Sequence, residues 1–345
     1  MEIPLELVAA KNAVEPELFA LPGVTGVGIG LREERGRLLD ELAIRVQVDD
    51  SRSIGPEIPD EIAGLPVCVV VRQIQPCVAP DTLRYLDLRG GIKIKNPLVA
   101  VGTMGLIVED VDTAELLGLT CYHVAGGPEN DFPHTVWQPD NPPLVVGLPP
   151  ADTDNLGAVD RVDFPHTPPL PGSPLLTGLV DAAAFHLDVA TSNGPAGLRP
   201  RTLSRGIVGQ SPGGANLVDK VTATARSFVT QPVRKRGYQT LVTFGTVIAN
   251  FWTVQWPVGG TNTWLIEQAE ILAEASNPAQ GINPDGVFAL PGDSGSLVLD
   301  KTQPTAVGLL WGANMPGEFG LPAGTFGMMS EIVNVESQLG VNVSL

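Results

Sequence analysis

Cysteine and histidine are scarce in this sequence. Its 345 residues include three cysteines, Cys68, Cys77 and Cys121, and four histidines. An odd and sparse set of cysteines excludes a disulfide framework, although a single Cys68–Cys77 bridge stays open, and it favours a reducing cytoplasm. No cysteines and histidines cluster at metal-ligand spacing and the acidic residues are scattered, so we expect no metal and no cofactor.

Basic residues are also few. Lysine and arginine number 21 against 38 aspartates and glutamates, which gives a formal net charge of −17. This balance argues against nucleic acid as a partner, because affinity for phosphates depends on basic side chains. The one basic cluster in the sequence, Arg234-Lys235-Arg236, is too short for a nucleic-acid patch, and we interpret it as a solvated strand end.

Long apolar runs are missing. The longest stretch without a charged residue, 237–266, contains Pro257, Gly259 and Gly260. A membrane helix would not carry such residues, whereas a pair of strands in a hairpin would. The acidic N-terminus lacks a basic start followed by an apolar core, so we expect no secretory signal and no membrane partner.

Glycine and proline, by contrast, are abundant. The 39 glycines and 32 prolines follow no period and lie among short apolar runs of β type, and 43% of the residues are hydrophobic. This composition predicts short strands joined by turns around real cores, not a disordered chain. A chain of this length can form two or three such cores.

Residues 1–80 are interpreted as a separate α+β module. Residues 4–14 predict a helix limited by Pro16, and the alternation over 42–48 predicts a strand with one buried face. The apolar run 67–71 predicts a buried strand. The glycine-rich stretch 23–30 lacks a G-x-G-x-x-G followed by a helix, so a strand is favoured over a phosphate loop. The module is expected to regulate access, recruit substrate, or mediate assembly with a partner or a second copy.

The C-terminal residues predict a further helix. Ser330 is its N-cap candidate, and Ile332, Val335 and Leu339 fall on one face. Gly340 suits the position just after the helix, where glycine adopts a left-handed conformation at low cost.

The most informative motif is Pro-Gly-Asp-Ser-Gly-Ser at residues 291–296, directly before the apolar run 297–299. A serine between glycines indicates a nucleophile in a tight turn, because glycine lets the backbone approach a substrate carbonyl and aim N–H groups at it. Taken alone, the motif is equally typical of an ordinary turn serine. A serine nucleophile also needs a base and an orienting carboxylate.

Two upstream residues fit those needs. His123 follows an apolar run and precedes small residues, and Asp181 opens the apolar segment 182–185. The other histidines lie in proline-rich loops or within the segment of Asp181. Asp160 and Asp163 are rivals for the carboxylate in the same region of the sequence.

The order histidine, aspartate, serine and the residues around each resemble the trypsin-like (chymotrypsin-fold) serine proteases. Further segments are similar to the Narrow Leaf type, a bacterial and plant subgroup, and the match runs from about residue 90 to the C-terminus. These segments are residues 90–94, 101–108, 137–139, 233–237, 240–247 and 306–312. Tyr122 is a mild departure, since many members of this subgroup have asparagine before the histidine.

The resemblance implies a mainly β fold: a trypsin-like double β-barrel with a C-terminal helix, preceded by the small α+β module. The first barrel is then expected within residues 81–190, and the second barrel with the helix within 191–345. Residues 191–197 would form the linker.

The resemblance also implies the roles of the site residues. Ser294 would attack the scissile carbonyl, His123 would take its proton and return it to the leaving amine, and Asp181 would orient the imidazole. Backbone N–H groups of Gly292 and Ser294 would form the oxyanion hole. An uncharged substrate pocket is expected from Phe288, Leu310, Trp311, Gly312 and Ala313.

We therefore expect a serine endopeptidase that acts on protein or peptide substrates through an acyl-enzyme intermediate. Two alternatives stay open. One is an interaction protein on a protease scaffold, catalytically silent or masked, because fold alone does not fix function. The other is an esterase or acyltransferase that uses the same three residues.

Overall fold

The structure is a computed structural model, and it describes most but not all of the chain. The described residues are 3–34, 37–48, 58–71, 74–75, 85, 87–96, 99–126, 135–138, 155–168, 175–187, 202–207, 220–256, 263–276, 283, 286–314 and 322–344. The expected linker at 191–197 lies outside them, as do Cys77 and His134. The expected domain boundaries, near residues 80 and 190, also fall among residues outside this set and stay predictions.

Six strands of the C-terminal half close into a barrel. Their order is β19-β22-β21-β20-β17-β18, and β18 pairs with β19 to complete the ring. The hairpin expected over 237–266 is confirmed by the antiparallel pairing of β18 with β19. The strands are β17 (Pro232–Gly237), β18 (Leu241–Gln255), β19 (Thr263–Ala273), β20 (Leu297–Asp300), β21 (Thr305–Asn314) and β22 (Phe326–Glu331).

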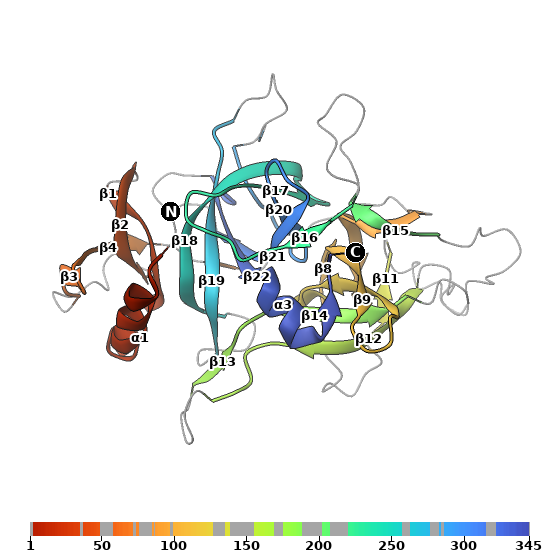
Figure 1. Cartoon of the computed structure of the whole chain (residues 1–345), viewed down its shortest axis with the longest axis horizontal. Coiled ribbons are helices and arrows are strands. Elements are labelled where there is room, and N and C mark those ends of the chain that lie inside the picture. The colour runs from red at the N-terminus through yellow and green to blue at the C-terminus, as the bar shows by residue number, and fades with distance from the viewer. Residues whose placement is uncertain are drawn as a thin grey trace, which may run out of the picture.

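The other large sheet, called the first sheet because it comes earlier in the chain than the barrel, has eight strands, and all of them except β23 lie between residues 92 and 186. Its order is β23-β9-β10-β14-β12-β11-β7-β8, so the last strand of the chain joins this sheet. Figure 1 shows the two sheets side by side, with α3 near the junction. The strands are β7 (Ile92–Lys95), β8 (Val101–Met104), β9 (Leu106–Asp110), β10 (Leu116–Thr120), β11 (Thr135–Trp137), β12 (Asn155–Asp163), β14 (Ala182–His186) and β23 (Val341–Asn342).

Short strands connect the parts of the molecule. Strand β6 (Asp87–Gly90) pairs in parallel with β15 (Thr202–Ile207), and β13 (Leu176–Gly178) pairs in parallel with β19. Strands β5 (Ile74–Gln75) and β16 (Ala223–Thr224) both pair with β21. The expected fold class, mainly β with a trypsin-like double barrel and a C-terminal helix, is confirmed.

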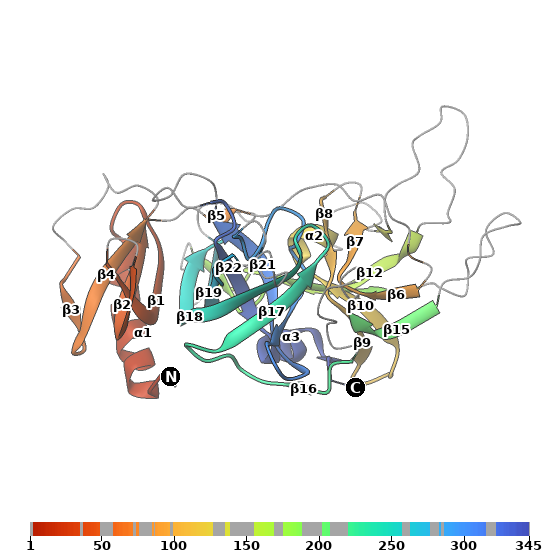
Figure 2. The same cartoon turned by 90° about the horizontal axis from the view of Figure 1, so that it is seen from above.

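The N-terminal elements pack beside the second barrel (Figures 1 and 2). Helix α1 (Leu5–Phe19) lies on a sheet of β1 (Val24–Glu34), β2 (Arg37–Val48), β3 (Glu61–Ile62) and β4 (Leu65–Val71). The glycine-rich stretch 23–30 falls in strand β1, as expected. Because β1 pairs with both β2 and β18, this sheet is continuous with the barrel.

Three expectations for the N-terminal elements are wrong in detail. Strand β2 does not have one buried face: residues 43–48 are all buried, and the outward Arg45 is covered and pairs with Glu33 and Glu270. Helix α1 does not end before Pro16 but continues to Phe19. Leu18 is buried against the core of β1 and β2, and this packing outweighs the one backbone hydrogen bond that proline cannot make. Strand β4 is only half-buried, with Cys68 and Val70 facing the core, because it lies near the edge of the sheet.

The C-terminal helix α3 (Ile332–Leu339) buries Ile332, Val335 and Leu339 as expected, and Gly340 ends it with φ 61° and ψ 42°. Its N-cap is Glu331, not Ser330. Ser330 still belongs to β22, where its hydroxyl donates to Gln268, so that oxygen does not cap the helix.

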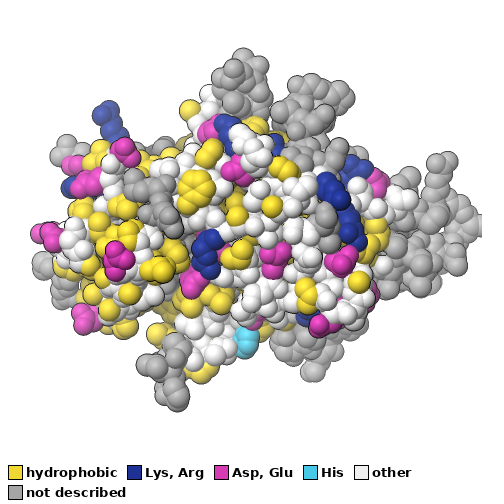
Figure 3. Space-filling model, viewed as in Figure 1, with side chains coloured by type: hydrophobic (Ala, Val, Ile, Leu, Met, Phe, Trp, Pro, Cys, Tyr) yellow, Lys and Arg dark blue, Asp and Glu magenta, His cyan; other side chains and the backbone are white. Residues whose placement is uncertain are grey.

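On the face shown in Figure 3, acidic side chains are dispersed among polar and hydrophobic ones. Among the helices that the structure describes, none combines the length and the apolar character that a membrane crossing requires.

Candidate active site

His123 and Asp181 meet at one end of the first sheet. His123 lies in α2 (Tyr122–Ala125), which follows β10, and Asp181 directly precedes β14. Strands β10 and β14 are antiparallel, with Thr120 opposite Ala183, so both side chains reach the same end. The His123 Nδ1 lies 2.5 Å from Asp181 Oδ2, and the His123 backbone N–H donates to Asp181 Oδ1 at 3.1 Å. Both side chains are buried.

A third donor completes the surroundings of the Asp181 carboxylate. The indole Nε1–H of Trp256 donates to Asp181 Oδ2 at 2.9 Å. An ionised carboxylate only accepts, so a neutral His123 carries its proton on Nδ1 and its lone pair on Nε2. His123 Nε2 is buried and has no hydrogen-bond partner among the described residues. The role of His123 as a base stays a prediction.

Ser294 lies in a turn that packs against the segment of His123. The carbonyl oxygen of Leu310 accepts from the Cys121 thiol at 3.2 Å and from the Gly295 N–H at 2.7 Å. These donors are close neighbours of His123 and of Ser294, so the two candidate residues come from segments that meet at one atom. The Ser294 hydroxyl itself donates to the carbonyl of Trp311 at 3.1 Å.

The turn around Ser294 leaves two backbone donors unused. Asp293 N donates to Leu290 O and Gly295 N to Leu310 O, but Gly292 N and Ser294 N donate to no acceptor within the described residues. Gly292 has φ 106°, which disfavours any side chain, and a Cβ there would lie 2.7 Å from Tyr238 Cε1. The two donors expected for an oxyanion hole are therefore not used by another acceptor among the described residues, and their role stays a prediction.

The expectation for the basic cluster is wrong. Lys235 is fully buried, and its ammonium lies 2.9 Å from Asp293 Oδ2. The same carboxylate accepts from the Thr240 hydroxyl and from the N–H groups of Gln239 and Thr240. Lys235 follows Val233 at a spacing of two, so it shares the inward face of β17 with that core residue. The cluster is therefore not a solvated strand end. Lys235 forms a buried ion pair with Asp293, the residue before Ser294.

The expected pocket residues all lie in the second barrel and are all buried. Phe288 packs where Cβ atoms on Gly245 or Gly327 would meet its ring at 2.9 and 2.8 Å. The Trp311 indole donates to Gln268 Oε1 at 2.9 Å. Asp285, three residues before Phe288, is the acidic residue that a shifted loop could bring into the expected pocket, and it lies outside the described residues. Their role in substrate binding stays a prediction.

The rival carboxylates contact other histidines. Asp160 lies 3.2 Å from His186 Nε2, and Asp163 lies 3.7 Å from His166 Nδ1. Among the described residues, only Asp181 pairs with His123. Burial raises the pKa of Asp163, and the nearby His166 offsets only part of that rise.

One group of side chains in the described part of the chain has the composition of a metal site. Ligand atoms of Cys121, His123 and Asp181 lie within 4.8 Å of one another. However, the Asp181 oxygens already accept three N–H donors, and the Cys121 thiol donates to a carbonyl. These hydrogen bonds account for the proximity of the three side chains without a metal ion, and the absence of a required metal stays a prediction.

Sequence reasoning missed Trp256 and Lys235. Neither has a local motif, because their partners lie 75 and 58 residues away in the chain. A signal existed only for Lys235, in its spacing from Val233.

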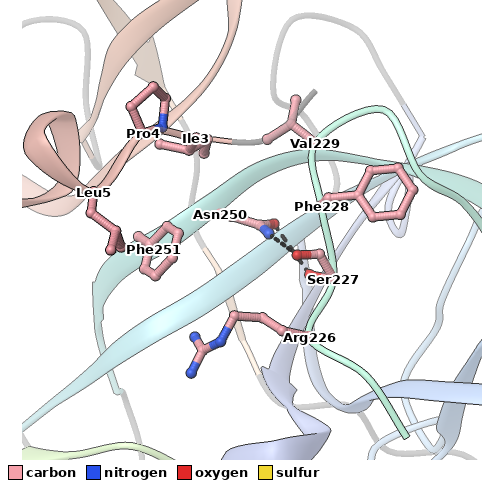
Figure 4. A pocket seen from close by; sticks show the side chains of 9 residues that line it. All are labelled: Ile3, Pro4, Leu5, Arg226, Ser227, Phe228, Val229, Asn250 and Phe251. Atoms are coloured by element: carbon pink, nitrogen blue, oxygen red, sulfur yellow. Dashed lines mark hydrogen bonds between the residues drawn. The ribbon is translucent and has the colours of Figure 1, made fainter. Parts of the chain in front are cut away.

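Two cavities lie away from this site, where the N-terminal elements meet the second barrel. One, of about 690 Å³, is lined by the start of α1, by residues 226–229 and by Asn250 and Phe251 of β18 (Figure 4). The other, of about 600 Å³, lies between α1 and strands β18 and β19. Neither is lined by His123, Asp181 or Ser294.

No protein-family model and no curated protein match the chain. Among solved structures, it is similar to a glutamic acid specific serine protease at 16% identity, covering 74% of this chain and 98% of that chain, with a TM-score of 0.44. It is similar to the Nocardiopsis protease NAPase at 18% identity, with coverages of 74% and 98% and a TM-score of 0.45. An alpha-lytic protease homolog, N4, is 16% identical, with coverages of 74% and 99% and a TM-score of 0.44.

Proposed function

We propose that this protein is a serine endopeptidase with Ser294 as nucleophile, His123 as general base and Asp181 as the orienting carboxylate. The observation that carries the proposal is the His123–Asp181 pair, whose free Nε2 belongs to a segment packed against the Ser294 turn. We place it in the trypsin-like family, with the Narrow Leaf type as the expected subgroup and a protein or peptide as substrate.

The first step follows from these contacts. The Ser294 hydroxyl turns from the Trp311 carbonyl toward His123 Nε2, which accepts its proton as the oxygen attacks the substrate carbonyl. Asp181 stabilises the imidazolium that forms. The N–H groups of Gly292 and Ser294 bind the oxyanion, an interaction whose loss costs on the order of 100-fold or more in rate. The imidazolium then protonates the leaving amine, and water hydrolyses the acyl-enzyme by the same route.

The proposed enzyme needs no freshly cut N-terminus. Zymogens of the trypsin type insert a new α-amino group beside the aspartate that precedes the nucleophile. Here Asp293 already faces the ammonium of Lys235. The candidate cleavage site, after Arg89, would leave a glycine and not an apolar residue at the new N-terminus. Control is expected instead from residues 1–80 or from a partner. A cytoplasmic location stays a prediction that rests on the odd and sparse set of cysteines.

The test is hydrolysis of an unstructured protein substrate by wild type, Ser294→Ala and His123→Ala, with the intact mass of each protein measured alongside. Wild type of uncut mass should cleave, and each single variant should lose at least about 10⁴-fold in kcat while keeping its circular dichroism spectrum. The double variant should be little worse than either single variant, because the residues act as a unit.

The alternatives give different results. Normal turnover by Ser294→Ala contradicts the assignment. Folded wild type that cleaves nothing favours the silent scaffold, and turnover of esters without any peptide cleavage favours the esterase or acyltransferase. Activity confined to a form cut near Arg89 contradicts the proposal about activation.

A further inference from the structure

Trp256 contacts the same carboxylate oxygen that binds the imidazole. Its indole Nε1–H and the His123 Nδ1 both reach Asp181 Oδ2, at 2.9 and 2.5 Å. Trp256 is 1% exposed and Asp181 is fully buried, so water does not replace this donor. A hydrogen bond to a buried charged group is among the stronger ones, and it fixes the direction in which the carboxylate faces.

Contacts to both the backbone and the ring hold Trp256 in place. The Trp256 backbone N–H donates to Thr263 O, and the Trp256 carbonyl accepts from the Thr263 hydroxyl, each at 2.8 Å. The ring packs against Tyr122 and Phe164, with centroids 5.7 and 6.1 Å away. Tyr122 directly precedes His123, so the tryptophan contacts the histidine segment as well as the aspartate.

The strand that leads into Trp256 depends on the N-terminal sheet. Strand β17 pairs with β18 only over residues 241–246. Beyond that point β1 takes its place, with Gly26 opposite Val254 and Val27 opposite Thr253. On the other edge, β19 pairs with the same end of β18. The N-terminal strand thus forms one of the two edges that hold the chain immediately before Trp256.

Close packing ties β1 to this part of β18. A Cβ on Gly28 would lie 1.6 Å from Cε3 of the Trp252 ring, so the ring fits only against a glycine. Trp252 is fully buried in the core cluster that also contains Trp256. A change in β1 therefore moves β18 four residues before the indole that contacts Asp181.

We propose that Trp256 is a positioning residue of the proposed triad and that β1 holds it in place, so that residues 1–80 act on the active site through β18. The inference rests on the proposed function. It assigns the N-terminal elements a structural link to Asp181 in place of direct contact with substrate.

Trp256→Phe tests the first part, because it removes Nε1–H and keeps an aromatic ring. Trp264→Phe is the matched control, since the indole N–H of the buried Trp264 has no hydrogen-bond partner among the described residues. We expect kcat of Trp256→Phe to fall roughly 10- to 100-fold with KM unchanged, and kcat of the control to stay within a few-fold. If Trp256→Phe does not fold, 3-benzothienylalanine at position 256 replaces the N–H by sulfur in a ring of the same size.

A measurement without substrate separates this inference from the proposed function. The proton between His123 Nδ1 and Asp181 should give a low-field NMR signal in wild type and Trp264→Phe. The signal should shift or be lost by exchange in Trp256→Phe. An unchanged signal, or a change in KM alone, overturns the role of Trp256. Lack of hydrolysis by wild type would contradict the proposed function while leaving this signal to be read.

The second part is tested with two glycines of β1. Gly28→Ala should displace Trp252, lower kcat and move the low-field signal as Trp256→Phe does. At Gly26 an added Cβ would lie 3.2 Å from Gln47 Cβ and 3.4 Å from the Trp252 ring, so Gly26→Ala should change both in the same direction but by less. A folded Gly28→Ala protein with wild-type kcat and an unmoved signal overturns the link through β1.

Discussion

The segment around His123 and the turn around Ser294 each contain or contact one buried aspartate, Asp181 and Asp293 respectively, but the two aspartates are held in different ways. Asp181 accepts two backbone or indole N–H groups and the imidazole, which becomes a cation only during the proposed reaction. Asp293 faces the permanent ammonium of Lys235. The charge of Asp181 thus stays available to stabilise an imidazolium, whereas the charge of Asp293 is already paired with Lys235 and stabilises the turn. Loss of the first should affect the rate, and loss of the second should affect stability.

Replacing Asp181 should have the largest effect on activity. Asp181→Asn removes the charge and favours the wrong tautomer of His123, so kcat should fall about 10⁴-fold. Asp163→Asn is the matched control, because Asp163 does not contact His123 and should leave kcat unchanged. Steady-state kinetics on both variants check the prediction. An Asp181→Asn enzyme within tenfold of wild type would remove the distinction between the two aspartates.

Removing the cation beside Asp293 should mainly cost stability. Lys235→Met leaves a buried carboxylate without its partner, which should lower the free energy of unfolding by about 3–5 kcal/mol. Lys301→Met is the control: its ion pair with Glu274 is partly exposed and should contribute under about 1 kcal/mol. Urea unfolding measures both. The double variant Lys235→Met/Asp293→Asn should recover part of the loss, and failure to do so would argue against charge pairing as the cause.

A buried carboxyl elsewhere in the second barrel sharpens the comparison. Glu331 accepts from the hydroxyl and the N–H of Ser227. Unlike Asp293, it has no buried lysine beside it in the part of the chain that the structure describes, and burial raises its pKa to about 7. The folded state then holds a proton that the unfolded state releases above pH 4.5. Its contribution is fully present below that value and is lost as pH rises through 7.

This pH dependence is testable by substitution. Wild type should lose roughly 3 kcal/mol of unfolding free energy between pH 4.5 and 8 relative to Glu331→Gln. Denaturant unfolding across that range gives the difference curve. Parallel curves for the two proteins would show that Glu331 does not titrate as described.

The smallest expected effect concerns substrate choice. Phe288, Leu310 and Trp311 carry no charge, so a Lys or Arg side chain would be buried without a carboxylate partner. Apolar or small residues on the acyl side of the cut should therefore be preferred by about 100-fold or more over basic ones. Peptide-library profiling measures this, and enrichment of Arg or Lys would show that these residues do not form the pocket.

The sequence predicted what local patterns and a family resemblance encode. The pairing of His123 with Asp181, the hairpin over 237–266 and the buried face of α3 follow from motifs, a family resemblance or periodicity. The tryptophan and lysine partners of the two aspartates did not follow, because both come from long-range packing. Lys235 was misjudged because its charge outweighed its place on the inward face of β17.

The most direct test of the account is labelling with a fluorophosphonate probe, followed by mapping of the modified residue by mass spectrometry. A reactive serine requires the base, the carboxylate and the turn together. We predict labelling of wild type at Ser294, none of Ser294→Ala, and strongly reduced labelling of His123→Ala and Asp181→Asn. Folded wild type that stays unlabelled, or is labelled at another residue, would contradict the assignment of Ser294 as nucleophile.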